Sequence, residues 1–431
     1  MNTPIYDFVK RYAASCAGRL HMPGHKGQGP LGVEALDITE VDGADSLYEA
    51  SGIIAESESN ASALFGCPTF YSTEGSSLAI RAMLFLSGAK KVLAGRNAHK
   101  TFLSAAALLD LDVAWLYPLP GDSYHACSVT TERLEQRILE EQPDAVYLTS
   151  PDYLGHMADV KSLAEVCHRH HVLLLVDNAH GAYLRFLAES LHPMDLGADM
   201  CCDSAHKTLP VLTGGAYLHV RPQWAGKAKQ ALALFGSTSP SYLILQSLDL
   251  ANRYLESYKD RLAAYLPEVE ALRQALSEQG FSLVEEEPLK ITIAAKAYGY
   301  TGDALADLLK QQGIFVEFYD PDFLVMMFTP ENGSLEQVRT ALCSIQKKEP
   351  IRGHIIPPYP PARAMSVREA VLSPSERLAA PMCIGRVLAQ TTVGCPPAVP
   401  IIMSGEIVDE NALRFFDYYG IRELEVVIDK G

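Results

Sequence analysis

The hydrophobic pattern between about residues 60 and 220 alternates between two periods. Apolar residues recur at helical spacing over 76–86, 101–109, 131–141 and 160–171, and short apolar runs separate them at 92–94, 113–117, 145–149, 172–176 and 216–220. In the segment 160–171, Val160, Leu163, Ala164 and Cys167 fall on one helical face. Alternating strands and helices predict an α/β fold, with a mostly parallel sheet covered by helices on both sides.

The pattern changes after this region. A linking helix is predicted over 243–258, followed by a strand at 289–294, a helix at 303–312, a strand at 323–328 and a helix at 335–345. The proline-rich stretch 357–361 is typical of a stiff connector. We therefore predict an N-terminal arm (1–30), a large domain with a seven-stranded type of sheet (31–255), a smaller α+β domain (256–350) and a C-terminal module (351–431).

Composition and charge narrow the possible functions. The chain has 431 residues, 48% of them hydrophobic and 20% charged, which is typical of a globular protein. Its formal charge of −16 argues against a nucleic-acid partner. The apolar runs fall short of the roughly 20 residues that span a membrane. Nine cysteines without disulfide-like spacing and an N-terminus without a signal-peptide pattern predict reduced thiols and a cytoplasmic protein.

The strongest chemical signal is the segment Ser204-Ala205-His206-Lys207, which follows a strand-ending aspartate, Asp177. A lysine amine in this context can form a Schiff base with the aldehyde of pyridoxal 5'-phosphate (PLP). The aspartate carboxylate can hold a proton on the pyridine nitrogen and so make the ring an electron sink. Alone, Lys207 would be interpreted as a surface lysine and Asp177 as an ordinary strand-end aspartate. The two together favour a PLP-binding site.

Two hydroxyl-bearing segments are candidate phosphate ligands. The segment Ser72–Ser77 opens a predicted helix, where backbone N–H groups and side-chain hydroxyls can bind a phosphate, although an ordinary helix cap explains it equally well. Ser204 lies three residues before Lys207 and could donate a second hydroxyl to the same phosphate.

Histidines supply further candidates. His99 precedes a helix and could stack on a flat ring, with an ordinary loop histidine as the alternative. His180 follows Asp177, and the small residues Ala179 and Gly181 beside it would allow a flat ring to approach the backbone. The cluster 167–171 contains cysteine and histidine without zinc-finger spacing, so we predict a solvated helix end and no metal site.

Taken together, these motifs resemble the ornithine/lysine/arginine decarboxylase family, PLP enzymes with the aspartate-aminotransferase fold (fold type I). The resemblance is to a short form without the N-terminal receiver-like domain of the larger members. It runs nearly end to end, through 21–27, 37–40, 52–54, 72–77, 96–100, 150–155, 177–181, 206–210, 237–242 and 396–400, with Gly405-Glu406.

The resemblance implies a role for each matching residue. It makes Lys207 the Schiff-base lysine, Asp177 the partner of the pyridine nitrogen and His99 the stacking histidine. It assigns the remaining contacts as follows: the phosphate to Gly75, Ser76 and Ser204; the cofactor and reacting group to His180 and His206; and the phosphate of the neighbouring subunit to Thr238 and Ser239. It therefore implies a homodimer with active sites at the interface.

The implied reaction is decarboxylation of lysine, arginine or ornithine to cadaverine, agmatine or putrescine, a step of polyamine biosynthesis. His206 or a nearby acid would protonate the substrate Cα. Another PLP reaction such as transamination, and a PLP-binding paralogue without activity, are the alternatives.

Three departures from the family pattern concern the substrate entrance and the strand end. Gly394-Cys395 stands where an aromatic residue is usual, Ala398 replaces a frequent glycine, and Asn178 often reads as glutamate. Glu317, Glu406 and Cys395 are the candidate substrate contacts. Each glutamate has a solvated carboxylate or a local ion pair as its alternative.

Overall fold

The computed structural model describes residues 1–15, 17–119, 125–126, 128–284, 287–352, 359–391, 394–395 and 399–428. The chain divides into two compact units. Unit 1 comprises residues 1–88 and 175–263, and unit 2 comprises residues 89–174 and 264–431.

The helices and strands have the following bounds. The α-helices are α1 (Pro4–Ala14), α2 (Ile53–Phe65), α3 (Gly75–Ser87), α4 (Lys100–Leu109), α5 (Thr131–Glu141), α6 (Val160–Arg169), α7 (Ala205–Thr208), α8 (Pro222–Phe235), α9 (Tyr242–Leu255), α10 (Tyr258–Glu278), α11 (Gly302–Lys310), α12 (Glu336–Cys343), α13 (Val367–Leu372) and α14 (Glu410–Tyr418). The strands are β1 (Thr69–Ser72), β2 (Lys91–Gly95), β3 (Asp112–Leu116), β4 (Ala145–Thr149), β5 (Leu173–Asp177), β6 (Met200–Asp203), β7 (Ala216–Val220), β8 (Leu283–Val284), β9 (Lys290–Ala294), β10 (Phe318–Tyr319), β11 (Phe323–Met327), β12 (Ser375–Ala379), β13 (Gly394–Cys395), β14 (Val399–Pro400) and β15 (Glu423–Val427).

The large sheet has seven strands in the order β1-β7-β6-β5-β4-β2-β3. Strand β2 runs parallel to β3 and β4, and β5 runs parallel to β6, whereas β7 runs antiparallel to both of its neighbours. The predicted α/β fold with a mostly parallel sheet is therefore confirmed. All five strands expected in the sheet are present within one or two residues of their predicted bounds.

Two strands of the sheet were not predicted. β1 and β6 have four residues each, with the sequences Thr-Phe-Tyr-Ser and Met-Cys-Cys-Asp. Runs this short and partly polar give no measurable period, so only pairing with their neighbours defines them as strands. The omission of β6 matters, because β6 leads directly into the segment that carries Lys207.

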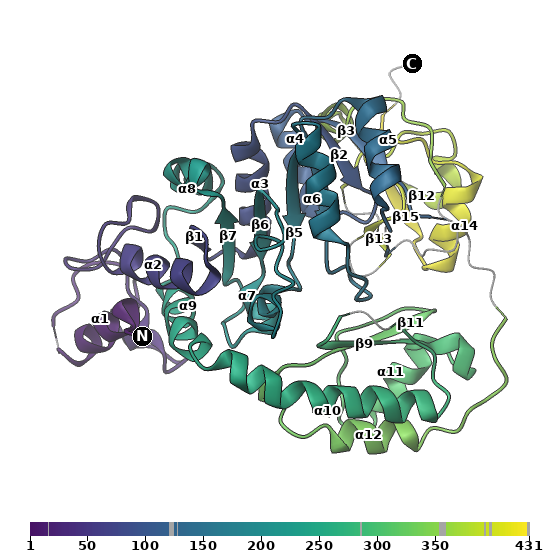
Figure 1. Ribbon diagram of the computed structural model, residues 1–431. Helices are drawn as coiled ribbons and strands as arrows, with labels where there is room; N and C mark the ends of the chain where they lie inside the picture. The colour runs from purple at the N-terminus through teal and green to yellow at the C-terminus, as the bar shows by residue number, and fades with distance from the viewer. Residues whose placement is uncertain are drawn as a thin grey trace. The chain divides into compact units, whose positions relative to one another are not determined.

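In unit 1, helix α3 packs on β6 and β7, and α8 packs on α3 (Figure 1). Helices α1, α2 and α9 pack on one another, so residues 4–14 of the predicted N-terminal arm form a helix whose apolar residues Ile5 and Val9 are buried.

In unit 2, helices α5 and α6 pack together, and the predicted apolar face of α6 is buried. The later strands form an antiparallel sheet in the order β10-β11-β9-β8, on which α11 packs, as expected of an α+β part (Figure 1). Residues between 380 and 426 share a hydrophobic core of their own. The predicted domain boundaries stay a prediction.

The C-terminal residues of unit 2 are anchored by a buried guanidinium. Arg96 donates from Nη1 to the Pro400 carbonyl and from Nη2 to the Ile401 carbonyl, each at 2.9 Å. Its Nη2 also lies 3.1 Å from Glu406 Oε2, and both side chains are at most 3% exposed. Burial raises the pKa of Glu406, and the charge of Arg96 acts in the opposite direction.

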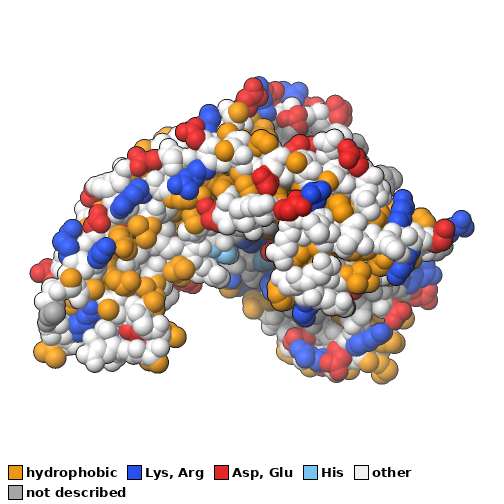
Figure 2. Space-filling model, turned by 90° about the horizontal axis from the view of Figure 1, so that it is seen from below, with side chains coloured by type: hydrophobic (Ala, Val, Ile, Leu, Met, Phe, Trp, Pro, Cys, Tyr) orange, Lys and Arg blue, Asp and Glu red, His pale blue; other side chains and the backbone are white. Residues whose placement is uncertain are grey.

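On the face drawn in Figure 2, acidic and basic side chains alternate with hydrophobic ones. Within the described ranges, no helix combines the length and the apolar character that crossing a bilayer requires.

Removal of the Glu406 carboxylate is expected to destabilise the fold. Glu406→Ala leaves the Arg96 charge buried without its partner, which should lower the free energy of unfolding by about 3–5 kcal/mol, whereas Glu406→Gln should cost less. Urea unfolding of both variants measures this. Glu423→Ala, which removes an exposed glutamate of β15, is the control. Equal stability of Glu406→Ala and the control would contradict the anchoring role.

A buried aspartate on α9 is expected to make stability depend on pH. The Asp249 carboxylate accepts hydrogen bonds from Ser57 Oγ (2.5 Å) and from the Tyr6 backbone N–H (3.0 Å). Burial raises the pKa of Asp249 from 3.8 to about 6. The folded chain therefore binds the proton more tightly than the unfolded chain, and this contribution to stability is lost as pH rises from about 4 to about 6.

Asp249→Asn cannot titrate, so its stability relative to the wild type should rise over that pH window by on the order of 2 kcal/mol. Thermal unfolding at pH 4.5 and 7.5 measures the change. Asp260→Asn, at an exposed position of α10, should show no such change. If the difference in stability between wild type and Asp249→Asn is the same at both pH values, the role of Asp249 in pH dependence is contradicted.

Candidate active site

Strands β5 and β6 bring the two chemically strongest segments to one edge of the sheet. The strands are parallel, and Asp177, the last residue of β5, is in register with Cys202. Because both strands end at the same edge, the residues after Asp177 and the short helix α7 after β6 begin side by side. This is the edge at which parallel α/β sheets carry their ligand sites.

Lys207 lies on α7 and contacts the segment that follows β5. Its Nζ is 3.0 Å from Nε2 of His180, which is 4% exposed. A protonated lysine can only donate, so His180 Nε2 accepts in this pair and can take up the lysine proton. The structure therefore brings together two residues that lie far apart in the sequence and were both predicted to belong to the site.

Asp177 is buried at the strand end. Its Oδ1 accepts a hydrogen bond from the Ala179 backbone N–H at 3.2 Å, and the Cys202 thiol lies 3.6 Å from the same oxygen. Burial raises the pKa of the Cys202 thiol well above its ordinary value, with a further contribution from Asp177. The thiol therefore stays protonated and can act as a donor to the carboxylate.

The predicted phosphate ligands meet at the start of α3. Ser204 Oγ donates to Ser76 Oγ at 2.9 Å, which joins the residue before α7 to the first turn of α3. Gly75 has a φ of +71°, and a Cβ there would meet no atom within 4 Å, so it is the conformation and not the space that favours glycine. The Gly75 backbone N–H donates to the Gly214 carbonyl at 2.7 Å, which joins the start of α3 to the residues before β7.

His206 is oriented by the backbone. Its Nδ1 lies 3.0 Å from the Gly215 carbonyl oxygen, which can only accept, so Nδ1 carries a hydrogen. The backbone N–H of His206 donates to the same oxygen at 3.1 Å. The Gly215 carbonyl therefore fixes both the orientation and the tautomer of the His206 ring, one residue before Lys207.

Asn178, which stands where the family often has glutamate, is hydrogen-bonded to a second buried residue, Asp203. Asn178 is fully buried, and its Nδ2 donates to Asp203 Oδ1 at 2.7 Å. Burial alone would raise the pKa of Asp203, but His192 and His219 hold it well below its ordinary value. A glutamate at position 178 would bring a second carboxylate against Asp203, so asparagine suits an aspartate at 203.

Sequence reasoning missed Asp203 and its neighbours. Recognising residues 200–203 as a strand would have revealed them. Side chains alternate along a strand, so Cys202 points towards Asp177 and Asp203 points to the opposite face.

The other predicted cofactor residues stay predictions. His99 belongs to unit 2, where its Nδ1 accepts from the Thr101 backbone N–H at 3.2 Å and caps α4. Thr238 and Ser239 lie in an exposed loop of unit 1, and the Ser239 backbone N–H donates to Ser237 Oγ at 3.1 Å.

The loop after β4 is fixed to the small sheet of unit 2. Lys290 Nζ donates to the Asp152 carbonyl at 3.0 Å and pairs with Glu287 at 2.7 Å, with both side chains 1% exposed. Thr292 Oγ1 donates to the Leu154 carbonyl at 2.7 Å. These contacts hold the intervening residue, Tyr153, over β10.

Among the three candidate substrate contacts, Glu317 has an exposed carboxylate. It accepts a hydrogen bond from the Tyr153 hydroxyl at 2.9 Å. Burial, and next the charge of Glu317, raise the pKa of Tyr153, so this hydroxyl remains a donor. Glu317 also lines a groove of about 410 Å³ beside Phe315 and Met327.

The other two candidates differ. The Glu406 carboxylate is engaged by Arg96 and by the Met403 backbone N–H at 2.6 Å, which is the local ion pair named as the alternative. These contacts favour that alternative, and the assignment of Glu406 as a substrate contact stays a prediction. The backbone of Cys395 lies in β13, while its side chain and Ala398 lie outside the described residues.

The residues of unit 1 fit PLP by their chemistry. The Lys207 amine could react with the aldehyde, the buried Asp177 carboxylate could pair with the ring nitrogen, and the Ser76–Ser204 pair at a helix start could donate hydroxyl hydrogen bonds to the phosphate. Contacts from Asp177 to Cys202 and from His180 to Lys207 connect these groups within one unit.

Comparison with known proteins agrees with this fit. The family model of the Orn/Lys/Arg decarboxylase major domain matches residues 3–287. Arginine decarboxylases of Bacillus subtilis and Halalkalibacterium halodurans are 29% and 30% identical to the chain, covering 96% of it and 92% of their own lengths. The crystal structure of a Francisella novicida lysine decarboxylase matches with a TM-score of 0.81 at 16% identity, over 99% of this chain and 81% of that one. The chain therefore belongs to the Orn/Lys/Arg decarboxylase family, and it is a PLP-dependent decarboxylase of fold type I.

Proposed function

We propose that the protein decarboxylates a basic amino acid, with Lys207 as the residue that attaches the cofactor. The observation that carries the proposal is the 3.0 Å contact between Lys207 and His180 at the sheet edge where Asp177 ends. Bound PLP supplies an aldehyde and an electron-withdrawing ring that takes up the electrons of the breaking carbon–carboxylate bond.

Lys207 must lose a proton before its amine can act as a nucleophile. His180 Nε2 is close enough to accept that proton directly. His180 is buried and Lys207 is half-buried, and the same nitrogen could return the proton to the lysine.

Asp177 would pair with the ring nitrogen of the cofactor. Its carboxylate is buried and hydrogen-bonded to a backbone N–H, so its position is fixed before the substrate arrives. A carboxylate fixed in this way would keep a proton on the ring nitrogen, and that positive charge would stabilise the negative charge that develops during bond cleavage. Asp177 should therefore affect turnover more than cofactor binding.

His206 is a candidate to protonate the substrate carbon after CO2 has left. The hydrogen bond from Nδ1 to the Gly215 carbonyl fixes the ring, so a proton on Nε2 would be delivered from a defined direction.

The substrate class is inferred from relatives. Two of them, at 29% and 30% identity, are named arginine decarboxylases, which makes arginine the first substrate to test, before lysine and ornithine. Glu317 offers an exposed carboxylate that a distal ammonium or guanidinium group could pair with.

We further propose a homodimer. The exposed loop 237–239 is positioned by the Ser237 backbone N–H, which donates to Glu74 Oε1 at 2.6 Å, and it presents Thr238 and Ser239 outward. Hydroxyls exposed in this way are available to a neighbouring subunit's phosphate site.

The reaction is tested by incubating the PLP-loaded protein with arginine, lysine and ornithine separately. CO2 and the amine should form in equal amounts from one of the three. Formation of a keto acid without CO2 would instead indicate transamination, and no product from any substrate would contradict the proposal.

Lys207→Ala is expected to lower turnover by roughly a thousandfold or more, because the attaching amine is lost. Borohydride should no longer fix the cofactor to the chain, as shown by the mass of the tryptic peptide containing residue 207. Lys227→Ala, which removes an exposed lysine of α8, should leave turnover and labelling unchanged. Labelling of Lys207→Ala at wild-type yield would contradict the assignment.

Glu317→Gln is expected to raise KM for the basic substrate by about fivefold with little change in kcat, as for loss of an exposed ion pair. Steady-state kinetics at low ionic strength measures it, with Glu331→Gln as a control at an exposed glutamate of the same unit. An unchanged KM would exclude Glu317 as a substrate contact.

A further inference from the structure

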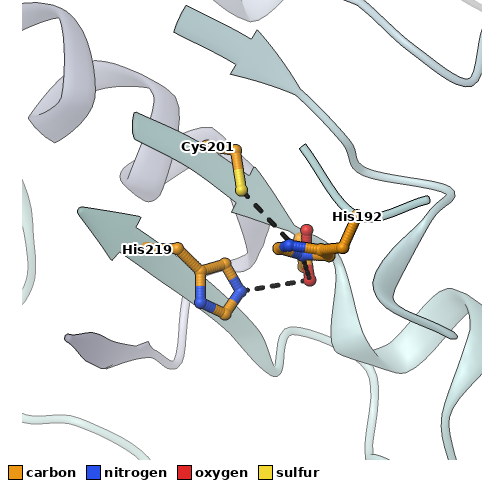
Figure 3. A group of neighbouring side chains, drawn as sticks. His192, Cys201 and His219 are labelled. Atoms are coloured by element: carbon orange, nitrogen blue, oxygen red, sulfur yellow. Dashed lines mark hydrogen bonds and ion pairs between the residues drawn. The ribbon is translucent and has the colours of Figure 1, made fainter. Parts of the chain in front are cut away.

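A second group of chemically active side chains lies behind β6, on the face opposite Cys202. It consists of His192, Cys201, Asp203 and His219, all of them buried. Cys201 and Asp203 alternate on β6, Cys201 is in register with His219 on β7, and His192 comes from the loop before β6. Figure 3 shows His192, Cys201 and His219 pointing towards one another.

The ligand atoms of this group converge on one point. His192 Nε2 and His219 Nε2 each lie 3.1 Å from Asp203 Oδ2, and Cys201 Sγ lies 3.9 Å from His192 Nε2. All four atoms lie within 4.8 Å of one another. Four ligands at the usual zinc–nitrogen, zinc–oxygen and zinc–sulfur distances in a tetrahedron are separated by about 3.3–3.8 Å.

The outer ring nitrogen of His219 has a polar partner. His219 Nδ1 lies 2.9 Å from Thr69 Oγ1, and the same hydroxyl lies 3.0 Å from the Cys67 carbonyl oxygen. With Nδ1 held in this way, His219 Nε2 points at Asp203 Oδ2. A contact of this kind orients a histidine that binds a metal ion through its other ring nitrogen.

The surroundings match the support that metal ligands usually receive. The second oxygen of Asp203 accepts from Asn178 Nδ2 at 2.7 Å, which orients the carboxylate. The Phe65 ring packs against His192 and His219, with ring centroids 5.7 and 4.6 Å apart, and so excludes water. One contact favours a network without an ion, namely the Met194 backbone N–H, 3.4 Å from His192 Nδ1.

We propose that His192, Cys201, Asp203 and His219 form a structural zinc site. A mixed nitrogen, oxygen and sulfur set favours Zn²⁺ over Mg²⁺ or Ca²⁺, and four protein ligands leave no position for a substrate. The ion would tie β6, β7 and the loop before β6 together, directly ahead of Ser204 and Lys207. The proposal concerns metal content and stability, and it does not depend on which amino acid is decarboxylated.

The test begins with untagged wild-type protein expressed in zinc-supplemented medium and dialysed extensively. Elemental analysis should find about one zinc ion per chain. Prolonged treatment with a strong chelator should remove the ion and lower Tm by roughly 10 °C, and added zinc should restore it. Zinc-free protein whose Tm does not respond to added zinc would overturn the proposal.

Variants then locate the ion. Cys201→Ser removes the thiolate but keeps the size of the side chain, and it should reduce retained zinc at least tenfold. Cys167→Ser changes another fully buried cysteine, on α6, and should retain zinc at the wild-type level. Equal zinc retention in the two variants overturns the assignment. If Cys201→Ser does not fold, anomalous scattering at the zinc edge from wild-type crystals decides the question, and a peak away from these four residues counts against the site.

Discussion

The parallel pairing of β5 with β6 is the constraint on which the candidate active site depends. Both strands end at the same edge, so the residues that follow Asp177 and those that follow Asp203 are brought together although they are distant in the sequence. The buried hydrogen bond from Asn178 to Asp203, at 2.7 Å, fixes the two strand ends to each other. Breaking it would leave polar groups unpaired in the interior, where their desolvation is costly.

Strand β6 serves two groups of side chains because its neighbouring residues point to opposite faces. Cys202 faces Asp177, on the side of the residues that fit the cofactor. Cys201 and Asp203 face the buried histidines. A strand of four residues therefore connects the candidate active site to the proposed zinc site, and any shift of β6 along β5 would disturb both.

Buried charges in unit 2 perform a different task. Arg96 binds two backbone carbonyls and Glu406 near the C-terminus of the chain, and Lys290 with Glu287 holds the loop after β4. Each charge is paired, and Arg96, Glu406 and Lys290 are also hydrogen-bonded to the backbone, which is the condition under which burial of an ion is tolerated. These contacts specify which segments pack together, whereas the apolar residues around them supply most of the stabilisation.

The sequence by itself determined the alternation of strands and helices, and the positions of Asp177 and Lys207 within it, because periodicity and strand-end placement are local properties. It did not reveal β1 or β6, since four-residue strands have no measurable period and exist only through pairing. It could not distinguish an exposed carboxylate at Glu317 from a buried one at Glu406, because burial depends on contacts with residues some hundreds of positions away, such as Arg96. The tertiary structure alone decided that His192, Cys201, Asp203 and His219 meet, because the register between β6 and β7 and the path of one loop bring them to a common point.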